Sequence, residues 1–307
     1  MRKIEVSIIY VNYNTSKLIA DSLISVFNLV KDISFEIIIV DNNSEKDLER
    51  KLTSFIGQNA FNIKYIYLEE NIGFGRANNV GAKIAEGEYL FLLNPDTILL
   101  NNAIKILNDF IKSRPKVGVV GGNLVTASDM PCFSFRKIFP GPDWDFQEFT
   151  HHIFRYPLNP RKCFFNFSDK PVKVAYIAGA DLMIKKSIFQ SVNGFPDDLF
   201  MYWDDVALCK LVRDLGYLIY NVPQAKIKHL VGESFNNINL NKTLKFELIE
   251  KYRFVYLRKY LSKPKVCVSN FFYKLFLDSR ILFLSSGNKK QYYKIRRNFY
   301  KKFLKLK

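Results

Sequence analysis

The chain of 307 residues lacks several features that would assign it to a class at once. Its four cysteines are scattered and form no Cys-x-x-Cys pair, which argues against a zinc cluster or a disulfide framework and fits a reducing cytosol. No run of 18 apolar residues occurs, and the apolar stretch near the N-terminus is too short for a signal peptide. We therefore expect neither export by a signal peptide nor a membrane-spanning helix.

Acidic residues are almost missing from the last part of the chain. Residues 241–307 carry 19 Lys and Arg against 3 Asp and Glu, whereas residues 1–240 carry 27 against 26. The ordinary composition of the first part provides enough apolar material for a core. The sequence thus predicts one folded domain at residues 1–240 and a basic, aromatic-rich helical tail at 241–307.

Apolar runs alternate with amphipathic stretches over the first hundred residues. Runs of this kind predict strands separated by helices, and that alternation is typical of an α/β fold with a mostly parallel central sheet. The expected strands are Val6–Val11, Phe35–Val40, Ile63–Leu68 and the run that starts at Tyr89, and the expected helices are Ser16–Val30, Glu45–Ile56 and a third that reaches about Glu86.

Polar residues follow these strands where each one ends. Asn12 and Asp41 directly follow an apolar run, and Asn14 and Asp96 come within three residues of the end of one. Pro95 must end the fourth strand because it has no N–H to donate. Ligands bind at the carboxyl edge of open α/β sheets, and a carboxylate there can hold a divalent cation against a diphosphate. A simple Asx-type turn at each strand end is the structural alternative.

Gly73-x-Gly75 and Arg76 open the third helix. Asn78 stands where a dinucleotide-binding fingerprint needs its third glycine, so that interpretation is disfavoured. The backbone N–H groups of a helix start, together with Arg76, suit a phosphate, although a solvated helix charge explains Arg76 equally well.

The second half of the chain contains fewer regular patterns. Residues 130–173 have no clean period and are expected to form a binding loop, a lid or an insertion. A strand is expected at Val174–Asp181, where Gly179 permits close backbone approach. The pair Asp204-Asp205 precedes a helix that reaches Leu215, and helix capping is the structural alternative to a functional role for these acids.

Taken together, these segments resemble an inverting family 2 glycosyltransferase of the rhamnosyltransferase-like kind. The matching segments cover most of residues 6–234, and the basic tail lies outside them. In chain order they are VSIIYVNYN, IIIVDNNS, ENIGFGRANNVGAKIAEGEYLFLLNPDT, YIAGADLMIKKSIFQSVNGFPDDLFMYWDDVALC and AKIKHLVGES.

The resemblance implies a single Rossmann-like GT-A domain that binds a nucleotide sugar, together with roles for individual residues. Asp205 corresponds to the catalytic base, and Asp204 stands beside it where relatives usually carry glutamate. Asp96 and His229 correspond to ligands of Mg²⁺ or Mn²⁺. Asn12, Asn14 and Asp41 are expected to contact the nucleotide, and Arg76 and Asn78 to lie along the donor phosphates and sugar. Asn94, Asp181 and Trp203 are further candidates for substrate binding.

The resemblance also implies substrates. The expected donor is a dTDP- or UDP-sugar that carries rhamnose or a similar hexose, and the expected acceptor is a glycan hydroxyl in cell-surface polysaccharide, O-antigen or capsule assembly. Two residues depart from the family pattern: Ala207 stands where many relatives have an acid, and Lys210 where an arginine is common. The contacts to the acceptor or the phosphates that those residues would make are therefore not predicted.

Two other functions are alternatives to glycosyl transfer. A nucleotidyltransferase of similar sheet topology is distinguished by the order of Asp96, Asp205 and His229. A nucleic-acid-binding protein could use the basic tail, but the aromatics there stand among aliphatic residues, which disfavours base stacking. We therefore expect no nucleic-acid partner.

The basic tail predicts peripheral association with the cytoplasmic face of a membrane and a lipid-linked acceptor. The apolar stretch Phe271–Leu284 is interrupted by three charged residues, so it can lie in an interface but cannot cross a bilayer. A tail packed on the first domain, or on a second copy in a homodimer, is the alternative.

Overall fold

The computed structural model describes residues 3–58, 63–154, 164–230, 242–283 and 287–305. The chain divides into two compact units. The sheet unit comprises Met1–Lys137, Pro160–Phe200 and Asp204–Asn239, and the helical unit comprises Ile138–Asn159, Met201–Trp203 and Leu240–Lys307. Beyond the tail that starts near residue 240, the helical unit therefore takes in two short segments from the middle of the chain.

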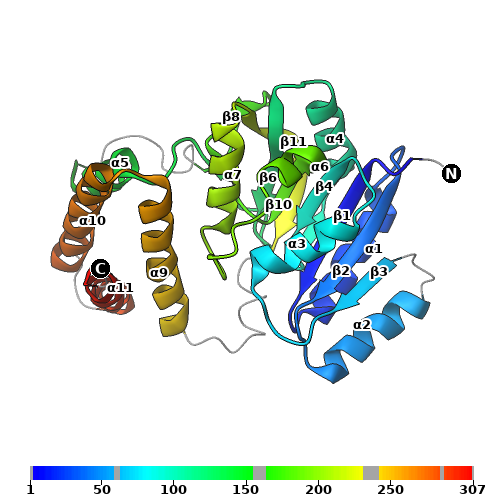
Figure 1. Ribbon diagram of the computed structural model, residues 1–307, viewed down its shortest axis with the longest axis horizontal. Coiled ribbons are helices and arrows are strands. Elements are labelled where there is room, and N and C mark those ends of the chain that lie inside the picture. Colours follow the sequence, from blue (N-terminus) through cyan, green and yellow to red (C-terminus); the bar gives the residue numbers. More distant parts are fainter. Residues whose placement is uncertain (1–2, 59–62, 155–163, 231–241, 284–286, 306–307) are drawn as a thin grey trace. The chain divides into compact units, whose positions relative to one another are not determined.

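Nine strands of the described residues form one mixed sheet, in which most strands point the same way (Figure 1). The order along the main path is β3-β2-β1-β4-β10-β6-β11-β5, and β8 pairs with β11. Only β5, β8 and β10 run against the rest. The strands are β1 (Val6–Asn12), β2 (Phe35–Asp41), β3 (Ile63–Tyr67), β4 (Tyr89–Leu93), β5 (Thr97–Leu99), β6 (Val117–Val125), β8 (Val172–Lys173), β10 (Asp181–Lys185) and β11 (Leu218–His229).

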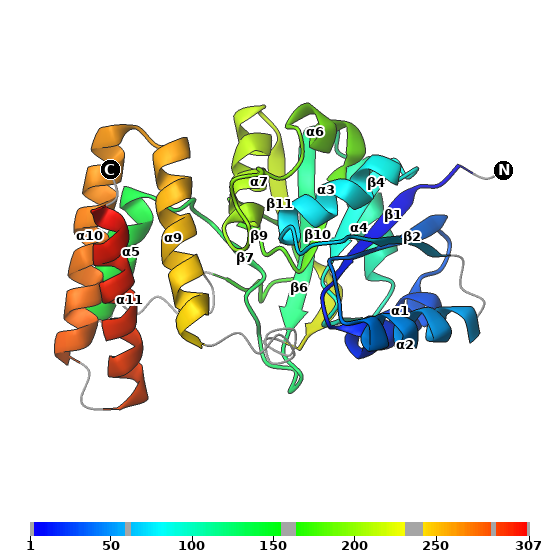
Figure 2. The same ribbon diagram turned by 60° about the horizontal axis from the view of Figure 1, so that its bottom comes forward.

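Helices cover both faces of this sheet, with α1 and α2 on one side and α3, α6 and α7 on the other (Figure 2). Ile8 and Tyr10 of β1 share a buried cluster with residues of α1 and α4, whereas Ile9 faces Gly81 of α3. Both faces of β1 are therefore buried, which is why its apolar run is unbroken. The helices are α1 (Ser16–Leu29), α2 (Lys46–Gln58), α3 (Phe74–Ile84), α4 (Ala103–Lys112), α6 (Lys186–Ser191) and α7 (Asp204–Asp214).

Two expectations for the second half of the chain are wrong. The segment Val174–Asp181, predicted as one strand, instead holds the two-residue β9 (Tyr176–Ile177) and the first residue of β10. β9 pairs with β7 (Phe135–Arg136) in a separate two-stranded sheet, whereas β10 belongs to the main sheet. The span 130–173 is not irregular throughout, since it holds β7, β8 and the helix α5 (Pro142–Phe154). Both errors involve partners that are distant in sequence.

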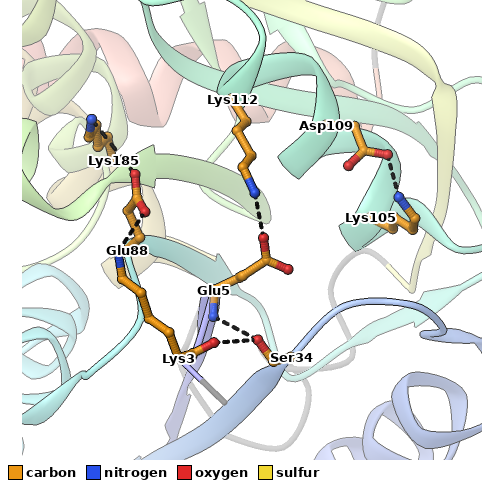
Figure 3. A network of polar contacts seen from close by, with 8 residues as sticks. All are labelled: Lys3, Glu5, Ser34, Glu88, Lys105, Asp109, Lys112 and Lys185. Atoms are coloured by element: carbon orange, nitrogen blue, oxygen red, sulfur yellow. Dashed lines mark hydrogen bonds and ion pairs between the residues drawn. The ribbon is translucent and has the colours of Figure 1, made fainter.

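Charged side chains cluster around the amino ends of β1, β2 and β4 (Figure 3). Lys112 of α4 contacts Glu5 at 2.7 Å, Lys3 contacts Glu88 at 3.3 Å, and the Ser34 hydroxyl accepts a hydrogen bond from the Glu5 N–H. These groups are largely exposed, so each pair contributes at most about 1 kcal/mol. The cluster fixes the amino edge of the sheet, and the candidate site lies at the opposite, carboxyl edge.

The helical unit is built from α5, α9 (Lys242–Tyr260), α10 (Lys263–Phe283) and α11 (Asn288–Leu304), as Figures 1 and 2 show. Phe254, Tyr273 and Leu277 belong to its aromatic core. Two buried ion pairs cross between helices: Arg253 Nη2 lies 2.7 Å from Asp145 Oδ2, and Arg296 Nε lies 2.6 Å from Glu250 Oε1. No helix in the described residues is long and apolar enough to cross a membrane.

Candidate active site

Asp41 and Asn12 lie side by side at the carboxyl ends of β2 and β1, where the two residues pair in register. Asp41 is fully buried and both of its carboxylate oxygens are engaged. Oδ2 accepts from Asn12 Nδ2 at 2.6 Å and from the Tyr65 hydroxyl at 2.5 Å, and Oδ1 accepts from the Ser44 N–H at 2.7 Å. Asp41 is therefore a rigidly held acceptor.

Asn14 joins the same loop cluster in a left-handed conformation, with φ of 57°. Its N–H donates to Ser44 Oγ at 2.9 Å, and its Oδ1 accepts from the Glu45 N–H at 2.8 Å. The structure thus brings Asn12, Asn14 and Asp41 together. Tyr65 and Ser44 were missed from the sequence; the position of Tyr65 on the strand next to Asp41 was the available signal.

The first turn of α3 follows Gly73, whose φ of 90° only glycine adopts easily. The Phe74 N–H donates to the Phe200 carbonyl at 3.0 Å, which leaves no room for a side chain on Gly73. Arg76 is exposed on this turn and makes no ion pair in the described part of the chain. Asn78 is buried and its Nδ2 donates to the Phe74 carbonyl at 3.1 Å, so its amide is partly occupied within the helix.

Asp96 and His229 meet just beyond the end of β4. Asp96 is buried, with 3% of its surface exposed, and its Oδ1 lies 3.3 Å from His229 Nε2. Antiparallel pairing of β5 with β11 sets His229 opposite Thr97, one residue after Asp96. Burial alone would lower the pKa of His229, but contacts with Asp96 and Cys132 raise it to about 9.

The pair fits a hard divalent cation. A buried carboxylate and an imidazole nitrogen at this separation supply one oxygen and one nitrogen ligand. The described residues offer no cluster of three or more His, Cys, Asp or Glu side chains. Such an ion would need further ligands from a substrate or water, as Mg²⁺ sites usually do.

Asn94 and Asp181 are held mainly by the fold. The Asn94 N–H donates to the Ala180 carbonyl at 3.0 Å. Asp181 is fully buried, and burial raises its pKa well above the usual range. Its Oδ2 accepts from the Gly122 N–H at 2.6 Å, and Asn221 Nδ2 donates to the Gly122 carbonyl, also at 2.6 Å. The pairing of β6 with β11 shifts register between Asn221 and Lys226, and Gly122 has no paired residue in β11 at this point. The Asp181 carboxylate accepts the hydrogen bond of the Gly122 N–H there, which is a structural role.

Asp205 lies at the N-terminus of α7 and is only partly buried. Its Oδ2 accepts from the Gly179 N–H at 2.9 Å and its Oδ1 from the Val206 N–H at 2.8 Å. A Cβ on Gly179 would lie 3.3 Å from that of Asp205, which agrees with the close approach predicted for this glycine. These two donors orient the carboxylate.

Asp204 is more deeply buried than Asp205, with 5% exposed surface. Its Oδ1 accepts from the Asp205 N–H at 3.1 Å, and its Oδ2 has no hydrogen-bond partner among the described residues. Burial raises the pKa of both carboxyls above the ordinary range, and the charge of Asp205 raises that of Asp204 further. The more exposed Asp205 is the better placed of the two to accept a proton.

Trp203 is occupied inside the helical unit. Its Nε1 donates to the Ile249 carbonyl at 3.0 Å, and its ring lies 5.6 Å from Tyr256 and 6.3 Å from Trp144. Trp203 and Tyr202 both have a φ of 67°, which is costly for bulky residues. Residues 231–241, which include the end of the AKIKHLVGES segment, lie outside the described part of the chain.

Comparison with known proteins decides the family. Residues 7–191, more than half of the chain, match the family described as Glycosyl transferase family 2. The chain belongs to glycosyl transferase family 2. The resemblance seen in the sequence is therefore confirmed.

Two curated relatives of this family 2 glycosyltransferase are rhamnosyltransferases. N-acetylglucosaminyl-diphospho-decaprenol L-rhamnosyltransferase of Mycobacterium tuberculosis (strain H37Rv) is 25% identical over 190 residues, which cover 55% of this chain and 59% of the relative. Rhamnosyltransferase WbbL of Escherichia coli (strain K12) is 24% identical over 240 residues, 75% of this chain and 86% of the relative. The chain thus spans less than two thirds of the mycobacterial relative that it matches.

Solved structures show the GT-A fold. GalNAc-T7 with UDP, GalNAc and Mn²⁺ superposes with a TM-score of 0.65 at 16% identity, covering 99% of this chain and 56% of that one. The mannosyltransferase PcManGT of Pyrobaculum calidifontis with GDP-Man and Mn²⁺ gives a TM-score of 0.60 at 14% identity, with coverages of 99% and 87%. The predicted α/β GT-A fold, with a mostly parallel central sheet and a helical C-terminal region, is confirmed.

Proposed function

We propose that this family 2 glycosyltransferase moves rhamnose or a similar hexose from a nucleoside-diphosphate sugar to a hydroxyl of a glycan acceptor, with inversion at the anomeric carbon. The observation that carries the proposal is the placement of Asp96 and His229 3.3 Å apart beyond the end of β4. In an α/β sheet of this family, that edge is where a donor diphosphate binds.

Asp41, Asn12 and Asn14 would hold the nucleotide, with the fixed Asp41 carboxylate as the acceptor for a base N–H. Arg76, exposed at the first turn of α3, would lie along the donor phosphates, where helix N–H groups also favour negative charge. Asn78 and Asn94 would contact the sugar side of the donor. A UDP- or dTDP-sugar suits this arrangement, because its pyrimidine base presents one such N–H.

Asp96 and His229 would hold Mg²⁺ or Mn²⁺, which would neutralise charge on the leaving diphosphate when bound. Both solved neighbours described above contain Mn²⁺. The donor set is small enough that the substrate must complete the coordination shell. The metal would therefore bind more tightly with nucleotide than without it.

Asp205 would act as the general base. Its carboxylate is oriented by two backbone N–H groups and remains partly exposed, so an acceptor hydroxyl can reach it. The raised pKa brings its basicity closer to neutral pH, where proton transfer from a hydroxyl is favoured. Removal of the proton as the hydroxyl attacks C1 from the side opposite the diphosphate gives inversion in one displacement.

The acceptor is proposed to be a lipid-linked glycan at the cytoplasmic face of the membrane, in assembly of a surface polysaccharide such as an O-antigen or capsule. The mycobacterial relative is named for a decaprenol-linked acceptor, and another relative is named a poly-β-1,6-N-acetyl-D-glucosamine synthase. Both names support an acceptor that is part of a growing glycan.

The test is a screen of nucleotide sugars for protection against thermal unfolding, in Mn²⁺ and in EDTA, followed by transfer assays with the donors that protect. A ligand that binds only the native state raises the melting temperature by mass action. We expect UDP- or dTDP-sugars to protect only with metal. Protection by none of the nucleotide sugars, with Mn²⁺ present, would contradict the proposal.

A further inference from the structure

Helix α10 of the helical unit is apolar on two opposite faces. Tyr273, Phe276 and Leu277 on one face are buried in the core of the unit. On the other face, Val268, Phe271 and Leu282 are 44%, 57% and 74% exposed. The residues of this second face recur at helical spacing, so they form a stripe along the helix.

Helix α5 extends the stripe with another exposed aromatic residue. Phe146 is 48% exposed, and its ring lies 5.0 Å from that of Phe272, which in turn lies 5.3 Å from Phe271. Phe283, 65% exposed, lies near the end of α10. We call this surface the outer face; it consists of Phe146, Val268, Phe271, Phe272, Leu282 and Phe283.

Residues 241–307, which supply most of the outer face, carry 19 Lys and Arg against 3 Asp and Glu, whereas α5 adds Asp143, Asp145 and Glu148. Each of the three acids in residues 241–307 forms an ion pair with a cation of α11: Glu247 with Lys302, Glu250 with Arg296 and Asp278 with Arg297. Lys274 shares Asp278 with Arg297. Other exposed lysines on α10 and α11 are Lys263, Lys265, Lys289, Lys294, Lys301 and Lys305.

We propose that the outer face docks on the surface of an anionic lipid bilayer. Exposed aromatic and aliphatic side chains enter the boundary between headgroups and acyl chains, and exposed lysines of α10 contact acidic headgroups. A second copy is a poorer occupant, because two units with this excess of positive charge repel each other. A spanning orientation is ruled out for the described helices by their length and composition.

This inference extends the proposed function, because docking would keep the enzyme where a lipid-linked acceptor resides. It does not depend on which sugar or acceptor is used, and lipid binding can be measured without any donor. Failure of docking would therefore leave glycosyl transfer untouched, and failure of transfer would leave docking untouched.

The experiment is flotation of the full-length protein with vesicles of phosphatidylcholine alone or with about 30% phosphatidylglycerol, a composition chosen as a probe of surface charge. The test variant is Phe271→Ser/Leu282→Ser. The matched control is Phe167→Ser/Leu215→Ser on the sheet unit, where the two side chains are 53% and 51% exposed. Melting temperatures and sedimentation velocity of all proteins are measured alongside.

We expect the wild type and the control to float with the anionic vesicles, less at high salt, and the test variant to bind at least about tenfold more weakly. A test variant that melts like the wild type and still binds normally would overturn the proposal. So would a wild type that floats with neither kind of vesicle at low salt. A wild-type dimer that the test variant converts to a monomer would instead identify the outer face as an interface between copies.

Discussion

At the scale of single residues, the adjacent acids at the start of α7 differ in what surrounds them. Asp205 accepts two backbone N–H groups and stays partly exposed, whereas Asp204 is buried with one oxygen unpaired in the described structure. Sequence proximity alone does not distinguish a base from its neighbour. The difference in exposure assigns the proposed proton transfer to Asp205 and a supporting position to Asp204.

Asp205→Asn should lower transfer by about 10²–10⁴-fold, because the amide cannot accept the acceptor's proton. One of the two backbone donors keeps its acceptor, so the fold and the donor affinity should change little. Asp204→Asn should be the milder change in kcat. Steady-state kinetics and nucleotide binding for both variants check this, and a larger loss in Asp204→Asn would move the base to Asp204.

The stability of the protein should depend on pH through Asp204. Its folded-state pKa is raised by burial, so its contribution to stability is complete below the unfolded-state pKa of about 4 and is lost as the pH rises through the folded-state value. Asp204→Asn removes this titration. The melting temperature of the variant relative to wild type should therefore increase between pH 5 and pH 8.

The exposed Asp197 provides a matched control for that measurement, as an Asp→Asn substitution outside the buried site. Thermal scans of the three proteins at several pH values decide the matter. A difference for Asp204→Asn that shrinks as the pH rises would show that the buried carboxylate is stabilised, not destabilised, in its ionised form.

At the scale of elements, the start of α3 depends on the contact between Gly73 and Phe200. A Cβ at Gly73 would lie 2.3 Å from the Phe200 carbonyl oxygen, at a φ that side chains disfavour. Gly73→Ala should therefore break the hydrogen bond from the Phe74 N–H, destabilise the fold by about 1–3 kcal/mol and weaken donor binding. Gly57→Ala in α2, where nothing lies within 4 Å, should be neutral or stabilising by up to about 1 kcal/mol.

Denaturant unfolding and nucleotide titration of the two glycine variants test this element. Equal stability of Gly73→Ala and wild type would mean that the loop before α3 moves without cost. Close approach to Phe200 would then not explain why residue 73 is a glycine.

The helical unit rests on the buried pair of Arg253 in α9 and Asp145 in α5. Burial raises the pKa of Asp145 despite the neighbouring Arg253. Arg253→Met leaves a buried carboxyl with only Ser269 as a partner and should cost about 3–5 kcal/mol, whereas Asp145→Leu/Arg253→Met should recover much of that loss. Lys274→Met, which breaks the exposed pair with Asp278, should cost less than about 1 kcal/mol.

A double-mutant cycle by urea denaturation measures the coupling between Asp145 and Arg253. If the unfolding free-energy changes of the two single substitutions summed to that of the double variant, this ion pair would not couple the stability of α5 to α9. The inclusion of α5 in the helical unit would then rest on apolar contacts alone.

The elements that the sequence predicted well are those fixed by local pattern. β1, β2 and β3 were placed to within about one residue, because buried runs and the polar residues after them mark both ends of a strand. The proximity of Asp96 and His229 was implied by the resemblance to family 2 glycosyltransferases. By contrast, the insertion of β10 between β4 and β6 and the docking of α5 beside α10 depend on partners far away in the chain, which periodicity does not reveal.

Trp203 illustrates the same limit within the candidate site. Its position next to two acids suggested a contact with substrate, but its indole N–H is bound by the Ile249 carbonyl. Nothing in the local sequence marks Ile249 as its partner. A role for Trp203 in substrate binding therefore remains a prediction, and its observed contacts are those of a core residue of the helical unit.

At the scale of the whole molecule, we propose different functions for two parts of different charge: glycosyl transfer for one and membrane docking for the other. The first 240 residues are nearly neutral and contain the candidate active site, whereas most of the positive charge lies in the helices of the second unit. Transfer and membrane docking are therefore separable by substitution. Variants of the outer face should retain transfer to a soluble acceptor, and variants of Asp96 or Asp205 should retain lipid binding.

The most direct test of the central claim is calorimetric titration of UDP and dTDP into wild type, Asp96→Ala and Asp205→Asn, each in Mn²⁺ and in EDTA. We predict binding of at least one nucleotide to wild type and Asp205→Asn in Mn²⁺ only, and at least about tenfold weaker binding to Asp96→Ala. Equal affinity with and without metal, or unchanged affinity in Asp96→Ala, would contradict the assignment of the metal-dependent donor site.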